Sequence, residues 1–209
     1  MYYDFIKRLL DIFGATFGLI LCSPVLIITA LAIKLDSKGP VMADTPMRVG
    51  KNGNLFYMFK FRSMVVGAQD LLQKNPELLK QYKKNSYKIY NDPRVTRVGK
   101  YIRKFSIDEF PQFINILRGE MSLVGPRAYY PFELEEQQKK YPQSRMFVKI
   151  ILSSKPGLTG VWQVSGRSDI NFDKRVEMDV KYVDNISLWS DLAIMLKTPW
   201  VMISAKGAL

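Results

Sequence analysis

The stretch from Ile12 to Ile33, IFGATFGLILCSPVLIITALAI, holds 22 residues without a charged side chain and decides how the rest of the chain is placed. As a helix at ~1.5 Å per residue it would reach roughly 33 Å, enough to cross a bilayer core of about 30 Å. We reject a cleaved signal peptide. The run is longer than an h-region of ~7–15 residues, and the small residues Val41 and Ala43 lie beyond three charged positions. The sequence therefore predicts a membrane helix.

The centre of this run carries Ser23-Pro24, and proline removes a backbone donor from a helix. One interpretation is a kinked helix that spans the membrane. The other is a re-entrant helix-break-helix, with both ends on one face. Basic residues flank the run on both sides (Lys7, Arg8, Lys34, Lys38). This gives no clear orientation for a span but suits two ends at the cytoplasmic face, so both interpretations stay open.

A second apolar stretch, LWSDLAIMLKTPWVMI, runs from Leu188 to Ile203. It is too short and too interrupted by charge to span a bilayer. Trp189 and Trp200 are typical of a helix that lies in the membrane interface. A terminal helix packed on the soluble core is an equally good interpretation. In either case Pro199 is expected to kink or end the helix.

The amino-acid composition limits which kinds of catalytic and metal sites the chain can form. The 209 residues carry 31 Lys and Arg against 19 Asp and Glu, a formal charge of +12, and 47% are hydrophobic, which excludes general disorder. There is no His and a single Cys, Cys22, so Ser-His and Cys-His pairs, imidazole zinc sites and disulfides are excluded. Carboxylates remain as metal ligands and favour hard cations such as Mg²⁺. The basic charge calls for an anionic partner, but no pattern of a nucleic-acid reader is present.

The polar middle of the chain is predicted to be mixed α/β and mainly helical, with few short strands. An aromatic strand is expected over Leu55–Met64, with Lys60 and Arg62 on one face. The predicted helices are Val66–Tyr87 with a break near Asn75-Pro76, Val95–Phe105, Asp108–Leu117, an exposed Glu133–Tyr141, and Asp173–Val183. Lys155–Arg167 contains three Gly and is expected to be a loop with a short strand.

The adjacent carboxylates Asp108-Glu109 are the most suggestive candidates for chemistry. Ser106-x-x-Glu109 also matches a capping box, and Pro111 suits the first turn of a helix, so capping alone has the greater weight on the motif itself. The functional interpretation gains because a chain without His has few other covalent nucleophiles. A carboxylate among Arg and Lys is expected to stay ionised. The Gly125-Pro126-Arg127 turn places a guanidinium at a rigid corner suited to phosphate.

Three motifs in order give the chain a specific resemblance. They are KFRSM at Lys60–Met64, DPRVTRVGKYIRKFSIDEFPQFINILRGEMSLVGPR at Asp92–Arg127, and KPGLTGVWQVSGR at Lys155–Arg167. Together with an N-terminal hydrophobic helix bearing Ser23-Pro24, they resemble the bacterial sugar transferases known as monotopic phosphoglycosyl transferases, in their minimal catalytic form. The resemblance covers nearly the whole chain.

The resemblance implies a two-step reaction. A carboxylate attacks the β-phosphate of a UDP-sugar and releases UMP, and polyprenyl phosphate then takes the phosphosugar. Carried onto this chain, Asp108 is the nucleophile and binds Mg²⁺, and Glu109 is its partner. The expected substrate-binding residues are Lys60, Arg62, Arg103, Arg127, Gln163 and Arg167. The wording of Trp162–Arg167 resembles members that transfer glucose or galactose 1-phosphate.

The resemblance also implies a topology. The expected parts are a re-entrant membrane helix over 1–36 that breaks at Ser23 and Pro24, a cytoplasmic catalytic body over 37–186, and an interfacial helix over 187–209. The protein would then be monotopic on the cytoplasmic face of the bacterial inner membrane. Its expected partners are a UDP-sugar, polyprenyl phosphate and the phospholipid membrane. A homodimer is left open and nucleic acid is not expected.

Two positions depart from the family pattern. Ala128 stands where a second proline usually follows the Gly-Pro-Arg turn, and Pro46 stands where a glutamine is common before Arg48. Both bear on donor choice more than on reaction type. The rival hypothesis is a non-catalytic basic adaptor that binds anionic lipid, with Asp108-Glu109 as a helix cap only.

Overall fold

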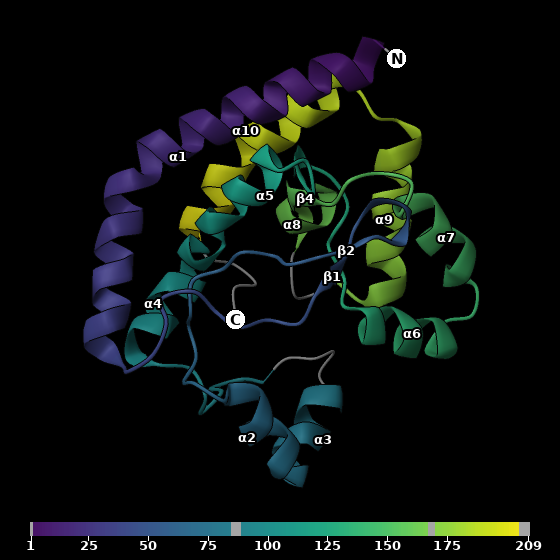
Figure 1. Cartoon of the computed structure of the whole chain (residues 1–209). Coiled ribbons are helices and arrows are strands. Elements are labelled where there is room, and N and C mark those ends of the chain that lie inside the picture. Colours follow the sequence, from purple (N-terminus) through teal and green to yellow (C-terminus); the bar gives the residue numbers. More distant parts are fainter. Residues whose placement is uncertain (1, 85–88, 167–169, 205–209) are drawn as a thin grey trace.

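The computed structural model describes residues 2–84, 89–166 and 170–204, and one long helix, α1 (Tyr2–Asp36), arches over a smaller body (Figure 1). The strands are short and the helices carry most of the chain. The remaining elements are β1 (Arg48–Val49), the 3₁₀ turn η1 (Lys51–Gly53), β2 (Leu55–Phe56), α2 (Ala68–Lys74), α3 (Pro76–Lys84), α4 (Arg97–Lys104), the 3₁₀ segment η2 (Ile107–Gln112), α5 (Phe113–Leu117), β3 (Ser122–Val124), α6 (Pro131–Lys140), α7 (Ser144–Ile151), β4 (Gly157–Thr159), α8 (Val161–Ser165), α9 (Phe172–Asp184) and α10 (Leu188–Ser204).

Helix α1 stays helical through Ser23-Pro24 and changes direction part-way along its length (Figure 1). Pro24 has no N–H to give to the carbonyl of Ile20, four residues earlier. The Ser23 hydroxyl donates to that carbonyl instead, at 2.8 Å. The serine thus satisfies the acceptor that the proline leaves open, which lets the helix bend without interruption.

The N-terminal half of α1 is fastened to the body by polar side chains. Lys7 Nζ contacts Asp191 Oδ2 of α10 at 2.6 Å. Arg8 donates to the carbonyls of Ile116 and Leu117, at 2.6 and 2.8 Å, and so caps the end of α5. Lys7 and Arg8 are the basic residues that precede the apolar run, and both contact the body of the protein.

The two ends of α1 both reach the body. Asp11 is buried, and its Oδ1 accepts from the Ser122 hydroxyl and the Leu123 N–H of β3, both at 2.9 Å. At the far end Ile33 is buried, and Asp36 Oδ2 accepts from the Val98 N–H of α4 at 3.2 Å. The helix therefore lies along the body and contacts it at the start and at the finish.

The predicted strand over Leu55–Met64 is only partly confirmed. Leu55–Phe56 forms β2, antiparallel to β1, and the residues that follow stay extended with isolated bridges from Phe61 to Met42 and from Met64 to Val95. The β1–β2 ladder stops after Phe56 because the Asn115 side chain bonds the Tyr57 carbonyl and the Phe59 N–H. β3 and β4 form a separate parallel pair, in which Ser122 aligns with Gly157.

The predicted helices of the body are found with adjusted limits. The long helix breaks at Asn75-Pro76 into α2 and α3, and α4 and α9 match their predicted segments. The predicted helix over Asp108–Leu117 begins as 3₁₀ (η2) before it becomes α5, and Lys155–Arg167 contains the helix α8 after its strand. The prediction of an exposed Glu133–Tyr141 helix is wrong at its start, because α6 buries Glu133 and Leu134.

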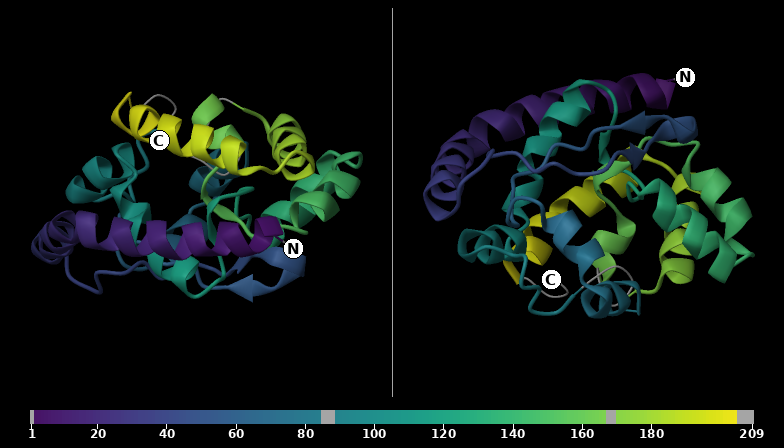
Figure 2. Two further views of the ribbon diagram at one scale, coloured as in Figure 1. Left: turned by 90° about the horizontal axis from the view of Figure 1, so that it is seen from above. Right: turned by 60° about the horizontal axis from the view of Figure 1, so that its bottom comes forward.

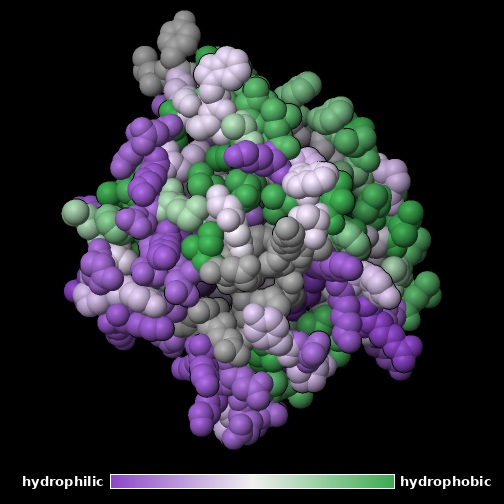
Figure 3. Space-filling view, turned by 180° about the vertical axis from the view of Figure 1, so that it is seen from behind, coloured by the Kyte–Doolittle hydropathy of each residue, from purple (hydrophilic) through white to green (hydrophobic). Residues whose placement is uncertain are grey.

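Helices α1 and α10 expose many of their own apolar side chains. Figure 2 shows the two helices running across one side of the molecule, and in Figure 3 hydrophobic residues gather at the upper right, where α1 lies, while hydrophilic residues gather at the bottom, where α2 and α3 lie. Trp189 and Trp200 of α10 are 80% and 75% exposed, yet Asp191 and Ile194 are buried. α10 thus packs on the body with one face and presents tryptophan on the other, and it continues through Pro199.

Candidate active site

The segment that carries Asp108 and Glu109 is not a capping box. Ser106 lies in the left-handed region with φ 55° and makes no side-chain cap to η2. Asp108 is buried, with its side chain 10% exposed, and Glu109 is 38% exposed. Because the serine does not cap and the glutamate points elsewhere, the interpretation of these carboxylates as a helix cap is wrong.

Lys60 meets both carboxylates. Its Nζ lies 3.3 Å from Asp108 Oδ2 and 2.8 Å from Glu109 Oε1. The backbone fixes this meeting, because the Phe61 N–H donates to the Asp108 carbonyl at 2.9 Å. The structure thus brings together three residues that the sequence analysis had named, from segments 48 residues apart.

Asn115 holds the extended segment in place and was missed by the sequence analysis. It is fully buried in α5, accepts from the Phe59 N–H at 2.9 Å and donates to the Tyr57 carbonyl at 2.7 Å. Glu120 accepts a second bond from the same amide at 2.6 Å. The signal was present as the single polar residue in the apolar segment Phe113–Leu117. Asn115 therefore sets the register that places Lys60 beside the carboxylates.

The two carboxylates differ in their electrostatics. Burial raises the pKa of Asp108, the Lys60 charge opposes this, and the neighbouring Glu109 adds to the rise. Burial also acts to raise the pKa of Glu109, but Lys60, Arg127 and Arg48 outweigh it, so its pKa is lowered. Desolvation thus acts against the charged form of Asp108, while the charges of Lys60 and Arg103 favour it, and the expectation that this carboxylate stays ionised remains a prediction.

Arg127 and Arg48 form the cationic wall next to Glu109. Arg48 is buried, its Cζ lies 3.3 Å from the centre of the Tyr130 ring, and it donates to the Ala128 carbonyl at 3.1 Å. Both arginines lower the pKa of Glu109. Arg48 was not among the predicted site residues, although its bond to Ala128 connects it to one of the two departures from the family pattern.

The remaining predicted residues fall in different places. Arg103 faces Asp108 closely enough to lower its pKa. Gln163 lies on α8, and its buried Oε1 has no hydrogen-bond partner within the described ranges.

Arg62 is buried away from the carboxylates and donates to Ser37 Oγ and to the carbonyls of Ser37, Pro40 and Met64. Arg167 lies outside the described residues. Ser23 and Pro24 form the bend of α1.

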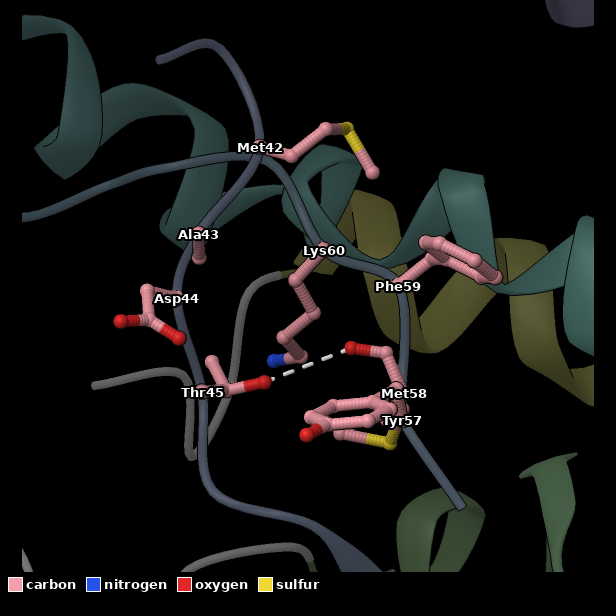
Figure 4. Close-up of a pocket in the computed structure, with 8 residues that line it drawn as sticks. All are labelled: Met42, Ala43, Asp44, Thr45, Tyr57, Met58, Phe59 and Lys60. Atoms are coloured by element: carbon pink, nitrogen blue, oxygen red, sulfur yellow. Dashed lines mark hydrogen bonds between the residues drawn. The ribbon is translucent and has the colours of Figure 1, made fainter. Parts of the chain in front are cut away.

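A small recess opens beside Lys60. Figure 4 shows it between two chain segments, 42–45 and 57–60, with the Lys60 side chain extending between them. Its volume is about 180 Å³, and the Thr45 hydroxyl donates to the Met58 carbonyl at 3.4 Å across it. The ammonium group thus connects the carboxylates to a hollow in the surface.

The carboxylate pair fits a hard cation bound together with a phosphate substrate. Lys60 engages Asp108 Oδ2 and Glu109 Oε1, one oxygen of each group, so the second oxygens could face a cation. Across residues 2–84, 89–166 and 170–204 no cluster of three or more His, Cys, Asp and Glu forms a dedicated metal cage. Mg²⁺ is commonly held by one or two carboxylates plus substrate phosphate, so this donor set suits it.

Comparison with known proteins gives one consistent result. A family model described as "Bacterial sugar transferase" matches residues 2–205. The chain is 43% identical over 207 residues to an undecaprenyl-phosphate galactose phosphotransferase of Salmonella typhimurium, covering 98% of this chain and 42% of that protein. It is 41% identical to the exopolysaccharide production protein ExoY of Rhizobium meliloti, covering 97% of this chain and 87% of that protein.

A third relative, from Aeromonas hydrophila, is a UDP-N-acetylgalactosamine-undecaprenyl-phosphate N-acetylgalactosaminephosphotransferase, 39% identical over 99% of this chain and 45% of that protein. The chain spans about two fifths of the length of the first curated relatives it matches. The family model nevertheless covers almost every residue, including Lys60, Asp108 and Glu109. The chain belongs to the bacterial sugar transferase family.

Proposed function

We propose that this chain transfers a sugar 1-phosphate from a UDP-sugar to polyprenyl phosphate, releasing UMP and forming polyprenyl-diphospho-sugar. The observation that carries the proposal is the buried Asp108 beside Lys60, with Glu109 completing the pair. Three relatives are named for sugar-phosphate transfer to undecaprenyl phosphate or for exopolysaccharide production. We infer that the product initiates assembly of a surface polysaccharide such as an exopolysaccharide, capsule or O-antigen.

The proposed first step is a displacement at the β-phosphorus. A carboxylate oxygen of Asp108 forms a bond to this phosphorus, the bond from phosphorus to the bridging oxygen breaks, and UMP leaves with that oxygen. The second step reverses the exchange. An oxygen of polyprenyl phosphate attacks the same phosphorus, the acyl phosphate bond breaks, and the Asp108 carboxylate is restored. A carboxylate suits this chemistry in a chain without histidine.

The cationic residues would make the approach of two anions feasible. Lys60 partly offsets the Asp108 charge, and Arg127 and Arg48 provide positive charge beside Glu109 for the diphosphate. We propose that Mg²⁺ bound by Asp108 would screen the phosphate charge. The arrangement favours catalysis over the alternative, a non-catalytic adaptor, because an adaptor that binds anionic lipid has no need for a buried carboxylate paired with lysine.

We propose that α1 enters the membrane and returns, so that the protein is monotopic at the cytoplasmic face. By length and composition α1 could cross a bilayer, a property shared by core helices and signal sequences. Its contacts at Lys7 and at Asp36 with the same body support two ends on one side. Single cysteines at Asp4 and Lys38, in a Cys22→Ser background, should be labelled from the same side. Labelling from opposite sides would establish a spanning helix.

The expected donor is UDP-glucose or UDP-galactose. The relatives differ here, since one is named for galactose and another for N-acetylgalactosamine. The test is purified protein with Mg²⁺, polyprenyl phosphate and a panel of UDP-sugars, scored by the nucleotide released. UMP is expected, with a mass adduct of one phosphosugar on the peptide containing Asp108 when donor alone is supplied. Release of UDP would instead indicate ordinary glycosyl transfer and overturn the proposal.

A further inference from the structure

Asp179 of α9 lies directly behind the turn that carries Arg127. Asp179 is only 1% exposed, and its Oδ2 accepts a hydrogen bond from the backbone N–H of Arg127 at 3.2 Å. Arg127 follows Gly125-Pro126, whose backbone is bonded to β4 through the Thr159 carbonyl and the Gly157 N–H, and the Asp179 bond holds the next N–H of this turn. The carboxylate therefore acts on the residue that delivers a guanidinium toward Glu109.

Two guanidinium groups share one indole at this place. The Arg127 Cζ lies 5.0 Å from the centre of the Trp162 ring, and the Arg175 Cζ lies 4.6 Å from a Trp162 ring centre. Arg175 and Asp179 are one helical turn apart on α9 and so lie on the same face. The charge of Arg127 acts to lower the pKa of Arg175, and the charge of Asp179 opposes this effect. Helix α9 thus places one cation and one carboxylate beside Arg127.

The polar atoms of this arrangement are incompletely satisfied. Asp179 Oδ1, Arg127 Nε and Arg175 Nε are buried, and none has a hydrogen-bond partner in the part of the chain that the structure describes. Buried polar groups are nearly always bonded, and an unbonded one costs stability. These unbonded atoms lie on the residues that surround the Arg127 side chain, next to the candidate active site.

We propose that Asp179 is a positioning residue, whose carboxylate fixes the Arg127 turn and balances Arg127 against Arg175 so that the Arg127 guanidinium is held toward the diphosphate of the donor. This inference rests on the proposed function. Asp179 itself would not touch the substrate. Its contribution is the orientation of a group that does, and misplacement of such a group can cost a factor of about 100 in rate.

Protonation of Asp179 should produce a distinctive dependence of activity on pH. Burial raises the pKa of Asp179 to about 7, and the Arg127 N–H and the charges of Arg175 and Arg127 oppose the rise. The other titratable groups that face this arrangement are Tyr129, which follows the turn, and Glu133 of α6, which acts on both arginines. A carboxyl group with a raised folded-state pKa contributes stability at acid pH that is lost as the pH rises through about 7.

The test compares Asp179→Asn with Asp184→Asn, the same substitution at an exposed position of α9. Asparagine can still accept from the Arg127 N–H but carries no charge. UMP release by Asp179→Asn should fall at least about tenfold at pH 8. The kcat/KM of the wild type should fall as the pH drops below about 7, because Asp179 becomes protonated. This acid-side decrease should be absent from the pH profile of Asp179→Asn. Above pH 7 the variant should melt no lower than the wild type, because the uncharged form removes a destabilising buried charge.

A second variant checks the charge balance. Arg175→Gln removes one of the cations that favour ionised Asp179, so the acidic component of the profile should move to higher pH by roughly one unit. Full activity of Asp179→Asn with an unchanged pH profile would overturn the positioning role. Loss of activity with a lower melting temperature would also overturn it, because the residue would then be structural. If the wild type releases no UMP, the proposed function fails instead, so the two failures are distinguishable.

Discussion

Helix α1 and the α8–α9 region both bury charged side chains, but they treat them differently. On α1 the side chains of Lys7, Arg8 and Asp11 each contact partners at 2.6 to 3.1 Å. In the α8–α9 region, buried polar atoms of Trp162, Gln163, Arg175 and Asp179 find no partner among the described residues. Buried polar groups are nearly always bonded, so the unbonded atoms of the α8–α9 region, next to the candidate active site, are exceptions. We therefore assign the first region to attachment and propose a role in the reaction for the second.

The largest effect is expected at the site itself. Asp108→Asn should reduce UMP release by more than a factor of about 1,000, because an amide cannot form the bond to phosphorus. Its melting temperature should not fall, since the substitution removes a desolvated carboxylate while Lys60 keeps Glu109 as its ion-pair partner. The measurement is UMP release together with a thermal melt, and Asp184→Asn serves as the matched control. Turnover close to the wild-type rate would show that Asp108 is not the nucleophile, and the catalytic role proposed for this site would then fail.

A smaller loss is expected from Lys60→Gln. The ammonium contacts both carboxylates, and losing one such electrostatic contact in an active site typically costs about 100-fold. We expect kcat to fall more than KM rises, because Lys60 acts on the reacting group. The exposed Lys139 gives the control substitution Lys139→Gln, which should leave both constants unchanged. Equal effects of the two substitutions would show that only surface charge matters.

The attachment region should respond in stability and not in chemistry. Asp191→Asn leaves Lys7 without its counter-ion in a place where the two side chains are 14% and 4% exposed, and a broken buried pair costs about 3 kcal/mol. Asparagine can still accept from the Tyr182 hydroxyl, which bonds Asp191 Oδ1 at 2.6 Å. The melting temperature should fall, while activity per folded molecule stays within about twofold. A stable but inactive variant would contradict the division between the two regions.

Much of the local structure could be predicted from the sequence, and its errors have physical causes. The break between α2 and α3 follows from Pro76, and α9 follows from apolar residues at helical spacing. The strand over Leu55–Met64 was overestimated because the side chain of Asn115, distant in sequence, captures the backbone after Phe56. The capping-box sequence pattern is present, but Ser106 adopts a left-handed conformation without a side-chain cap, and Glu109 pairs with Lys60.

The site shows the same division. Asp108, Glu109 and Lys60 were identified before the structure, on the motifs that carry the resemblance. Arg48, Arg175 and Asp179 were not predicted, since nothing local distinguishes a surface arginine or aspartate from one buried behind an active site. Asn115 and Trp162 were also missed, although Asn115 stands out as the single polar residue of Phe113–Leu117. Arg62 and Lys60 were predicted on one strand face, yet Arg62 bonds the loop after α1 and only Lys60 reaches the carboxylates.

The sequence by itself determined the long apolar N-terminal helix, the basic charge and the absence of histidine chemistry, because these follow from residue content over short distances. It could not determine which charges meet. Lys60 and Asp108 lie 48 residues apart, and Asp179 lies 52 residues from Arg127. Such pairs form only when packed elements bring them together, and burial then changes what the groups do. The tertiary structure therefore decided the pKa order of Asp108 and Glu109 and the support behind Arg127.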